Sequence, residues 1–304
     1  MRSLLTSILL ASVVMATGTG ADALATPDTR PALPPLRYAA QVVDGHELLA
    51  YDAEGDGRIV EVLGDLRHAD HIAVLVPGAG HSLDTYFSGR AGGTPRQSGL
   101  ALLAELRRQA PHEQVAVVVW LGYDTPEGVD AASARSDRAR PGARDLARLT
   151  HQLPAAARIT LVGHSYGSVV IGQAAPAARA DDIVVVGSPG LDAAVEADLR
   201  TGATVWAARA PGDPIRFAPP VRIAGWGHGA APTSSSFGAR SFAVGDIRGH
   251  SSYFTPGSES LSNIARIVRG RPDEVTGPTP RTPRPETTVT MPVASVAAAP
   301  KGAI

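Results

Sequence analysis

Residues 158–168 read Arg-Ile-Thr-Leu-Val-Gly-His-Ser-Tyr-Gly-Ser, "RITLVGHSYGS", and this stretch decides the fold. The apolar, β-branched run at 158–162 predicts a buried strand. The run "SVVIGQAA" at 168–175 predicts a helix. Between them, Ser165 is flanked at two residues' distance by Gly163 and Gly167. The stretch therefore predicts a strand, a tight turn centred on a serine, and a helix.

Apolar runs and helical patterns alternate along the rest of the chain in the same way. Runs such as "VAVVVW" at 115–120 and "DIVVVGS" at 182–188 show no period-two alternation, so both of their faces are expected to be covered. This predicts a three-layer α/β domain with a mostly parallel sheet, and an antiparallel hairpin at 47–63 that turns at 55–57. The expected further strands are 72–76, 158–162, 203–209 and 240–244, and the expected helices are 99–109, 145–153, 168–175, 192–199 and 259–268.

Composition narrows the class of protein. The 304 residues are 44% hydrophobic and 19% charged, with a net charge of −1, which suits a globular protein without an electrostatic footprint for nucleic acid or anionic membranes. There are no cysteines, which excludes disulfides, thiolate metal sites and a cysteine nucleophile. The sequence makes no prediction of oligomeric state.

Both ends of the chain differ from the middle. Arg2, the apolar stretch 4–16 and the small residues at Ala23 and Ala25 predict a signal peptide over 1–25, and hence a secreted protein. A Pro-rich leader is expected at 26–37, an α/β domain at 38–271, and a disordered Pro/Thr-rich tail at 272–304. After the signal peptide no stretch approaches the 18 apolar residues that a transmembrane helix needs, so no transmembrane segment is expected.

Ser165 is the candidate nucleophile. In a parallel sheet, ligands bind at the C-terminal ends of the strands, which is where this serine lies. A G-x-S-x-G pattern at a strand–turn–helix junction is typical of a nucleophile elbow, and the helix N-terminus favours the negative charge that develops during attack. The alternative is a serine that only caps the helix.

A serine nucleophile needs a base, and His250 is the candidate. It follows the last expected strand, in "VGDIRGHSSYF", which gives the chain order serine, acid, histidine. His164, beside the serine, is expected to have a role in the core, and His81 and His228 lie in loops that could border a site. The remaining histidines are expected at the surface: His46, His68, His71, His112 and His151.

Asp213 is the preferred candidate for the acid that orients the base. It follows the strand 203–209 in "APGDPI", a turn made rigid by two prolines. The alternatives are that Asp213 is a plain turn residue, and that Asp192 or Asp246 is the acid.

An oxyanion hole requires two N–H groups aimed at one point. The backbone of Tyr166 would supply one, and Ala79, in the loop "VPGAGHSLDTY", the other. The alternative for that loop is an ordinary Gly-rich turn. It has no G-K-[ST] pattern for binding phosphate.

Substrate selection is expected to lie in loops. About 15 residues separate the strands 182–188 and 203–209, which leaves no room for a large cap domain there. Two longer loops, 122–140 and 214–239, could cover the site. Within the second loop, Trp226 and Phe217 are candidate substrate-contacting residues, with packing on the core as the alternative for Trp226.

The motifs "LVPGAG", "VVVWLGYDTPEG", "LVGHSYGS", "APGDPI" and "GHSSYF" resemble those of the α/β-hydrolase superfamily of serine esterases and lipases. The resemblance spans roughly 46–270. Within this range the motifs are similar to those of a group of secreted actinobacterial α/β-hydrolases of unknown function. It implies a triad of Ser165, Asp213 and His250, supports Ala79 and Tyr166 as oxyanion donors, and requires no metal or organic cofactor. Where many esterases have His-Gly after the third strand, this chain has Pro-Gly at 77–78.

The residues and the resemblance together predict a secreted serine hydrolase that cleaves a small-molecule or lipid-like acyl ester through an acyl-enzyme. An acyltransferase or an amidase would use the same triad. A binding protein on a hydrolase scaffold, without catalysis, is the alternative from another class.

Overall fold

The computed structural model describes residues 33–88, 93–128 and 130–278, and these residues form one mixed sheet of nine strands. The strands lie in the order β1-β2-β3-β5-β4-β6-β7-β8-β9. β1, β2, β3 and β5 pair antiparallel, and β5, β4, β6, β7, β8 and β9 pair parallel. The strands are β1 Gln41–Val43, β2 His46–Asp52, β3 Arg58–Gly64, β4 His71–Val76, β5 Val115–Leu121, β6 Arg158–His164, β7 Asp182–Val186, β8 Thr204–Ala208 and β9 Arg240–Ser241.

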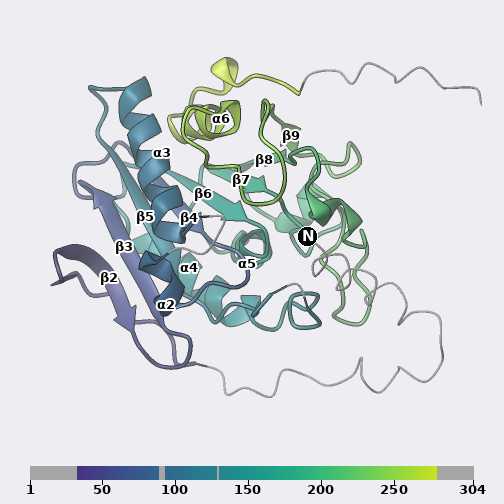
Figure 1. Cartoon of the computed structure of the whole chain (residues 1–304), viewed down its shortest axis with the longest axis horizontal. Helices are drawn as coiled ribbons and strands as arrows, with labels where there is room; N and C mark the ends of the chain where they lie inside the picture. Colours follow the sequence, from purple (N-terminus) through teal and green to yellow (C-terminus); the bar gives the residue numbers. More distant parts are fainter. Residues whose placement is uncertain (1–32, 89–92, 129, 279–304) are drawn as a thin grey trace, which may run out of the picture.

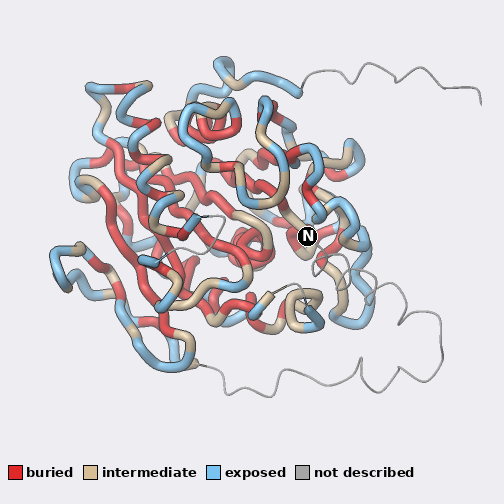
Figure 2. Tube along the Cα trace, viewed as in Figure 1, coloured by how far each residue is buried: buried red, intermediate tan, exposed pale blue. Residues whose placement is uncertain are grey.

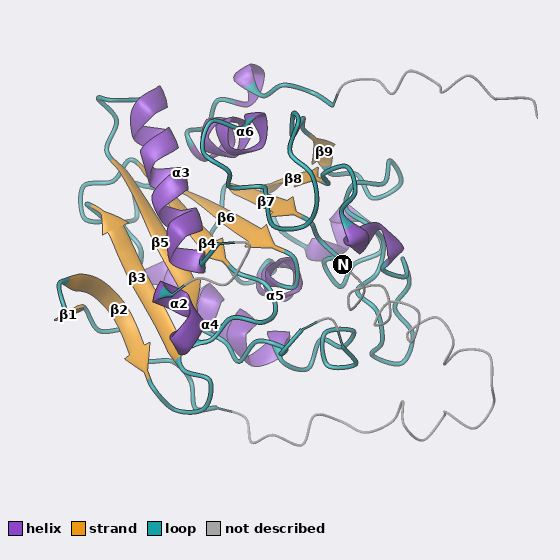
Figure 3. Ribbon diagram, in the orientation of Figure 1, coloured by secondary structure: helices purple, strands orange, loops and turns teal. Residues whose placement is uncertain are grey.

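Helices cover both faces of the sheet (Figures 1 and 3). The α-helices are α2 Leu83–Phe87, α3 Pro95–Gln109, α4 Ala139–Gln152, α5 Gly167–Ala174 and α6 Glu259–Val268, and the 3₁₀ helices are η1 Glu196–Leu199, η2 Pro214–Phe217 and η3 Pro272–Glu274. α4 and α5 pack on one face and α3 and α6 on the other.

The apolar runs explain the two cores. In β4, Ile72 and Val74 belong to the core under α4 and α5, whereas Ala73 and Leu75 belong to the core under α3 and α6. A strand between two layers of helices needs apolar side chains at every position. The central strands β5 and β7 are accordingly buried along their whole length, and β4 and β6 at every position except their ends (Figure 2). The expected fold, a three-layer α/β domain with antiparallel N-terminal strands, is confirmed.

Two expected elements are shorter than predicted. The strand expected at 240–244 is reduced to β9, because the N–H of Ala243 donates to the carbonyl of Thr276 instead of continuing the sheet. The helix expected at 192–199 forms only as η1, since Asp192 has a φ of +57°, which an α-helix does not allow.

The packed domain extends past both expected boundaries, 38 and 271. Before residue 38, Leu36 is buried and its N–H donates to the Asp145 carboxylate at 2.8 Å. After residue 271, Thr276 exchanges hydrogen bonds with the buried Asn263, at 2.7 and 3.1 Å. The expected signal peptide 1–25, most of the leader and the tail from 279 lie outside the described residues. Within the described ranges, no helix has the length and apolar character needed to cross a membrane.

Candidate active site

Ser165 lies at the turn from β6 to α5, with a φ of +53°. A positive φ is uncommon for a residue other than glycine and stores backbone strain. The close packing of the turn explains its glycines. A Cβ at Gly167 would lie 2.3 Å from the carbonyl oxygen of Val76, and one at Gly163 would lie 2.8 Å from Ile171. The turn is therefore pressed against the end of β4, and its serine is held out from the sheet.

The structure brings Ser165, His250 and Asp213 into one hydrogen-bonded chain. His250 Nε2 lies 2.8 Å from Ser165 Oγ, and His250 Nδ1 lies 2.9 Å from Asp213 Oδ1. A carboxylate only accepts, so Asp213 keeps the ring proton on Nδ1 and leaves Nε2 to accept from the serine. This is the arrangement that a serine needs in order to lose its proton during attack.

Asp213 is fully buried and is held by three donors. Oδ1 accepts from the Ile215 N–H at 2.8 Å as well as from His250, and Oδ2 accepts from the hydroxyl of Tyr253. That hydroxyl in turn accepts from the N–H of Ala210 at 2.9 Å. Burial acts to raise the pKa of Asp213, but the hydrogen bonds from His250 and Tyr253 outweigh it and hold the pKa below its usual value. The acid therefore stays ionised next to the histidine.

The loop after β4 lies directly over the serine. A Cβ at Gly78 would be 2.7 Å from the Cβ of Ser165, so the loop passes at a distance that only glycine allows. A residue of another segment fixes the loop, because the hydroxyl of the buried Tyr123 donates to the carbonyl of Pro77 at 2.8 Å. Among the described residues, neither the Ala79 N–H nor the Tyr166 N–H has an acceptor, which leaves both available to an oxyanion.

His164 has a position that the sequence did not indicate. It is half-buried and lines the cavity at Ser165, not the core as expected. Its Nε2 lies 2.7 Å from the carbonyl oxygen of His250, and the two rings are 4.8 Å apart. Burial, reinforced by the nearby His250, lowers the pKa of His164 to about 3. The only indication of this role in the sequence is that His164 directly precedes Ser165.

A cavity of about 220 Å³ opens at Ser165 and His250. Its apolar wall comes from β4, the start of α3 and the loop after His250, and polar side chains lie among these. Burial lowers the pKa of the lining His81, because desolvation disfavours the charged imidazolium. The apolar lining residues are Leu75, Pro77, Ala79, Pro95, Tyr253 and Phe254, and the polar ones include His81, Thr85, Thr94, Ser98, His164 and Ser251.

Trp226 and Phe217, the residues expected to contact substrate, lie outside this cavity. Neither lines it, and within the described residues nor does any other part of the loops 122–140 and 214–239. Trp226 lies under the guanidinium of Arg135, which is 5.4 Å from its ring centroid. Phe217 is 59% exposed, with Arg216 over its ring. Both side chains are engaged by arginines of their surroundings, away from the serine.

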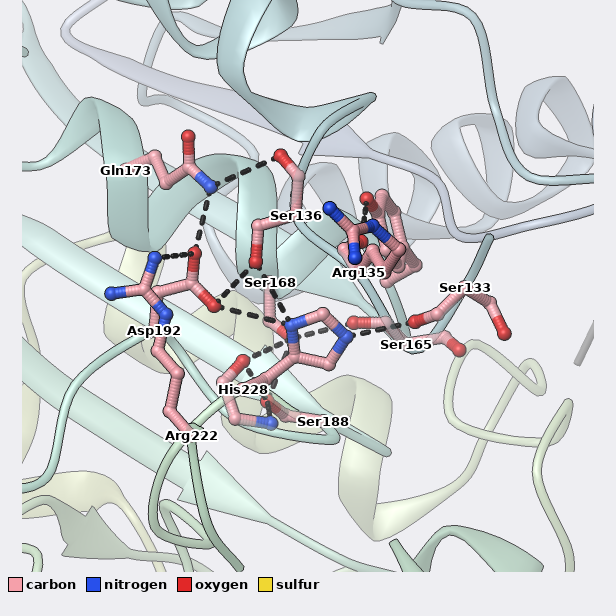
Figure 4. Close-up of polar contacts among 12 residues, drawn as sticks. Ser133, Arg135, Ser136, Ser165, Ser168, Gln173, Ser188, Asp192, Arg222 and His228 are labelled. Atoms are coloured by element: carbon pink, nitrogen blue, oxygen red, sulfur yellow. Dashed lines mark hydrogen bonds and ion pairs between the residues drawn. The ribbon is translucent and has the colours of Figure 1, made fainter. Parts of the chain in front are cut away.

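The two alternative acids lie elsewhere. Asp192 belongs to a buried polar cluster drawn in Figure 4, in which its carboxylate accepts from Ser136 at 2.7 Å and Gln173 at 2.7 Å and lies 3.1 Å from His228 Nδ1. Burial acts to raise the pKa of Asp192, but the bonds from His228 and Ser136 outweigh it and lower the pKa. Asp246 is exposed. The structure pairs His250 with Asp213 and with neither alternative.

His228 Nδ1 also lies 3.3 Å from Ser136 Oγ, but that hydroxyl donates its proton to the Asp192 carboxylate, so the contact is not a nucleophile–base pair like that of Ser165 and His250. His228 Nε2 lies 2.8 Å from the carbonyl oxygen of Ser133, so both ring nitrogens face fixed partners within the cluster. The ring of Tyr166 meets His228 edge-on at 5.6 Å, which ties the cluster to the first residue after the nucleophile. Among the described residues, no group of three or more His, Cys, Asp or Glu side chains could hold a metal ion.

A mostly parallel sheet with a serine elbow after a central strand is the arrangement of the α/β-hydrolases. The family model described as "Alpha/beta hydrolase" matches residues 52–223, more than half of the chain. The chain belongs to this alpha/beta hydrolase family.

Similar proteins come from mycobacteria, fungi and other bacteria. An uncharacterized protein of Mycobacterium tuberculosis is 30% identical over 266 residues, which cover 74% of this chain and 39% of the relative. An uncharacterized protein of Mycobacterium bovis is 33% identical over 171 residues, which cover 52% of this chain and 62% of the relative. The chain thus spans less than two thirds of the length of these relatives.

Among solved structures, a Trichoderma reesei cutinase in complex with a phosphonate inhibitor matches with a TM-score of 0.41 at 13% identity, covering 68% of this chain and 78% of the cutinase. An alpha-beta serine hydrolase homologue from Coxiella burnetii matches with a TM-score of 0.38 at 12% identity, covering 76% of this chain and 98% of that one.

Proposed function

We propose that this protein is a secreted serine hydrolase that cleaves carboxylic esters through an acyl-enzyme on Ser165. The observation that supports it is the continuous hydrogen-bonded chain from Ser165 Oγ through His250 to the buried Asp213. The signal peptide expected at 1–25 supports secretion. N-terminal sequencing of the protein from culture medium should therefore begin at Thr26, and a sequence that began at Met1 would contradict secretion by cleavage.

In the first half of the reaction, Ser165 Oγ attacks the acyl carbon of the ester and its proton passes to His250 Nε2. Asp213 stabilises the imidazolium, and the N–H groups of Tyr166 and Ala79 bind the oxyanion. The bond from the acyl carbon to the alcohol oxygen then breaks, and that oxygen takes the proton from His250. The acyl group remains on the serine.

In the second half, a water molecule attacks the acyl carbon and gives its proton to His250. The bond to Ser165 Oγ breaks, the serine recovers its proton from His250, and the carboxylic acid leaves. Each group returns to its initial state, so no co-reactant other than water is needed.

The size of the cavity supports a short acyl group. An apolar cavity of roughly 150 Å³ holds one benzene molecule. The cavity at Ser165 has about 220 Å³ and has apolar walls on β4 and after His250. We therefore propose esters of acids with a few carbon atoms as substrates, and expect long acyl chains to bind poorly.

Labelling with a fluorophosphonate tests the nucleophile. Wild-type protein should be labelled, Ser165→Ala should not, and the exposed Ser241→Ala should be labelled like wild type. Hydrolysis of p-nitrophenyl esters from acetate to dodecanoate then tests the substrate class. An unlabelled wild-type protein would contradict the serine mechanism, and a maximum at dodecanoate would contradict the short acyl group alone.

A further inference from the structure

His164 and His250 are joined by a hydrogen bond whose direction is fixed. The carbonyl oxygen of His250 can only accept, so the proton lies on His164 Nε2, 2.7 Å away. Burial keeps this imidazole neutral far below neutral pH, so its Nδ1 carries no proton. His164 is therefore a neutral imidazole in the Nε2–H tautomer, and it donates to the main chain of the base.

That main chain has little regular structure to hold it. His250 lies in the loop between β9 and α6, and this loop contains no helix or strand. Another main-chain bond near it is the Gly249 N–H to the carbonyl of Pro211, at 3.0 Å. The bond from His164 anchors the loop on a second segment, at the last residue of β6. Since Ser165 follows His164 directly, one short segment carries the serine and holds the backbone of the base.

The ring of His164 also contacts the aromatic residues that follow the base. Its centroid is 5.8 Å from that of Tyr253 and 6.5 Å from that of Phe254. Tyr253 donates to Asp213, so His164 packs against both the base and the residue that holds the acid. A cation at this position would oppose the positive charge that His250 acquires during attack, which explains why a neutral donor suits it.

We propose that His164 is a positioning residue that fixes the His250 main chain, and thereby the distance from His250 Nε2 to Ser165 Oγ. The inference rests on the proposed serine mechanism. The hydrogen bond to the His250 carbonyl acts on proton transfer, so its loss lowers kcat. Because the His164 ring also lines the cavity, the comparison of the glutamine and asparagine variants, and not KM, separates positioning of the base from substrate contact.

Three substitutions separate this role from simple packing. In His164→Gln, the side-chain amide nitrogen occupies about the place of Nε2 and can donate to the same carbonyl, whereas in His164→Asn it occupies about the place of Nδ1 and does not reach. His164→Leu has no donor. Because the Gln and Asn variants carry the same amide group, a difference between them reports the reach of the donor rather than polarity.

The assay is hydrolysis of a short p-nitrophenyl ester, with active sites counted by fluorophosphonate labelling and folding checked by thermal melting. We expect kcat to fall roughly 10- to 100-fold in the Leu and Asn variants, part of the 10²–10⁴ that a general base contributes, and the Gln variant to stay within about fivefold of wild type. His151→Leu is the matched control, because His151 Nε2 also lies 2.8 Å from a carbonyl, that of Ala177, but at an exposed site. It should leave kcat unchanged.

Two results would overturn the inference: a wild-type kcat in folded His164→Leu, or equal kcat values in the Gln and Asn variants. If the Leu variant does not fold, the comparison of Gln with Asn still decides. Absence of labelling and hydrolysis in the wild-type protein would instead refute the serine mechanism, so the two failures are distinguishable.

Discussion

Replacing Asp213 by asparagine removes the charge of the acid while keeping its shape. Two N–H donors, from His250 and Ile215, converge on Oδ1. The amide oxygen therefore takes that position, and the amide nitrogen faces the hydroxyl of Tyr253, which already accepts from Ala210. The variant keeps the ring proton of His250 on Nδ1 but loses the negative charge and leaves the Tyr253 hydroxyl without its acceptor.

The size of the effect follows from this arrangement. Asp213 is fully buried, so its charge is screened little by water. Removing one partner of a buried, hydrogen-bonded charge pair costs about 3–5 kcal/mol. If that loss falls on the transition state, where His250 carries its positive charge, kcat falls by about 10²- to 10⁴-fold, since about 1.4 kcal/mol corresponds to a factor of ten.

The measurement is kcat/KM for a short p-nitrophenyl ester in Asp213→Asn, with Asp246→Asn as the control. Asp246 is exposed and precedes His250 by four residues, so its variant changes the charge of the same loop without touching the base. We expect the control to stay within about tenfold of wild type. Full activity in Asp213→Asn, or a crippled Asp246→Asn, would refute the assignment of the acid.

Three further outcomes are expected. Gly78→Ala should lower kcat by about 10²- to 10³-fold by displacing the loop of an oxyanion donor, while Gly128→Ala, whose added Cβ would meet nothing within 4 Å, should keep wild-type kcat. Asp192→Asn should lower the Tm at pH 7 by about 6–12 °C for about 3 kcal/mol lost. The pKa of Asp192 is lower in the folded state, so the stability that its carboxylate contributes is complete above its unfolded pKa of about 3.9 and is lost as the pH falls further. Below about pH 4 the Tm of the variant should therefore fall less steeply than the Tm of the wild type. Deletion of 272–304 should lower the Tm by several degrees and deletion of 279–304 should not, because only the first removes the bonds to the buried asparagine of α6; equal melting curves would contradict this.

The local patterns predicted the fold well because each was strong on its own. The run at 115–120 and the strand–turn–helix at 158–175 need no distant partner to be recognised. β9 was predicted too long, since the pairing of Ala243 with Thr276 joins segments 33 residues apart in the chain. A contact of that kind leaves no periodic pattern in either segment.

The candidate site was likewise predictable in part, where local patterns carry it. The chain order and the turn residues pointed to Ser165, Asp213 and His250, which lie together in the structure, and their catalytic roles remain a prediction. The sequence could not place the walls of the cavity. Trp226 was chosen for its chemistry, but its position depends on Arg135, and the direction of the His164 side chain depends on a carbonyl 86 residues away. Such choices are made by tertiary packing and not by local preference.

The left-handed backbone of Ser165 has a consequence for anyone who engineers this protein. A glycine adopts that conformation without the cost of about 1–3 kcal/mol that a strained residue carries. A selection for heat resistance alone would therefore favour Ser165→Gly and return a hardier protein without its hydroxyl. The proposed nucleophile thus occupies a position whose backbone conformation suits glycine better than serine, and a screen for stability has to be coupled to a screen for turnover.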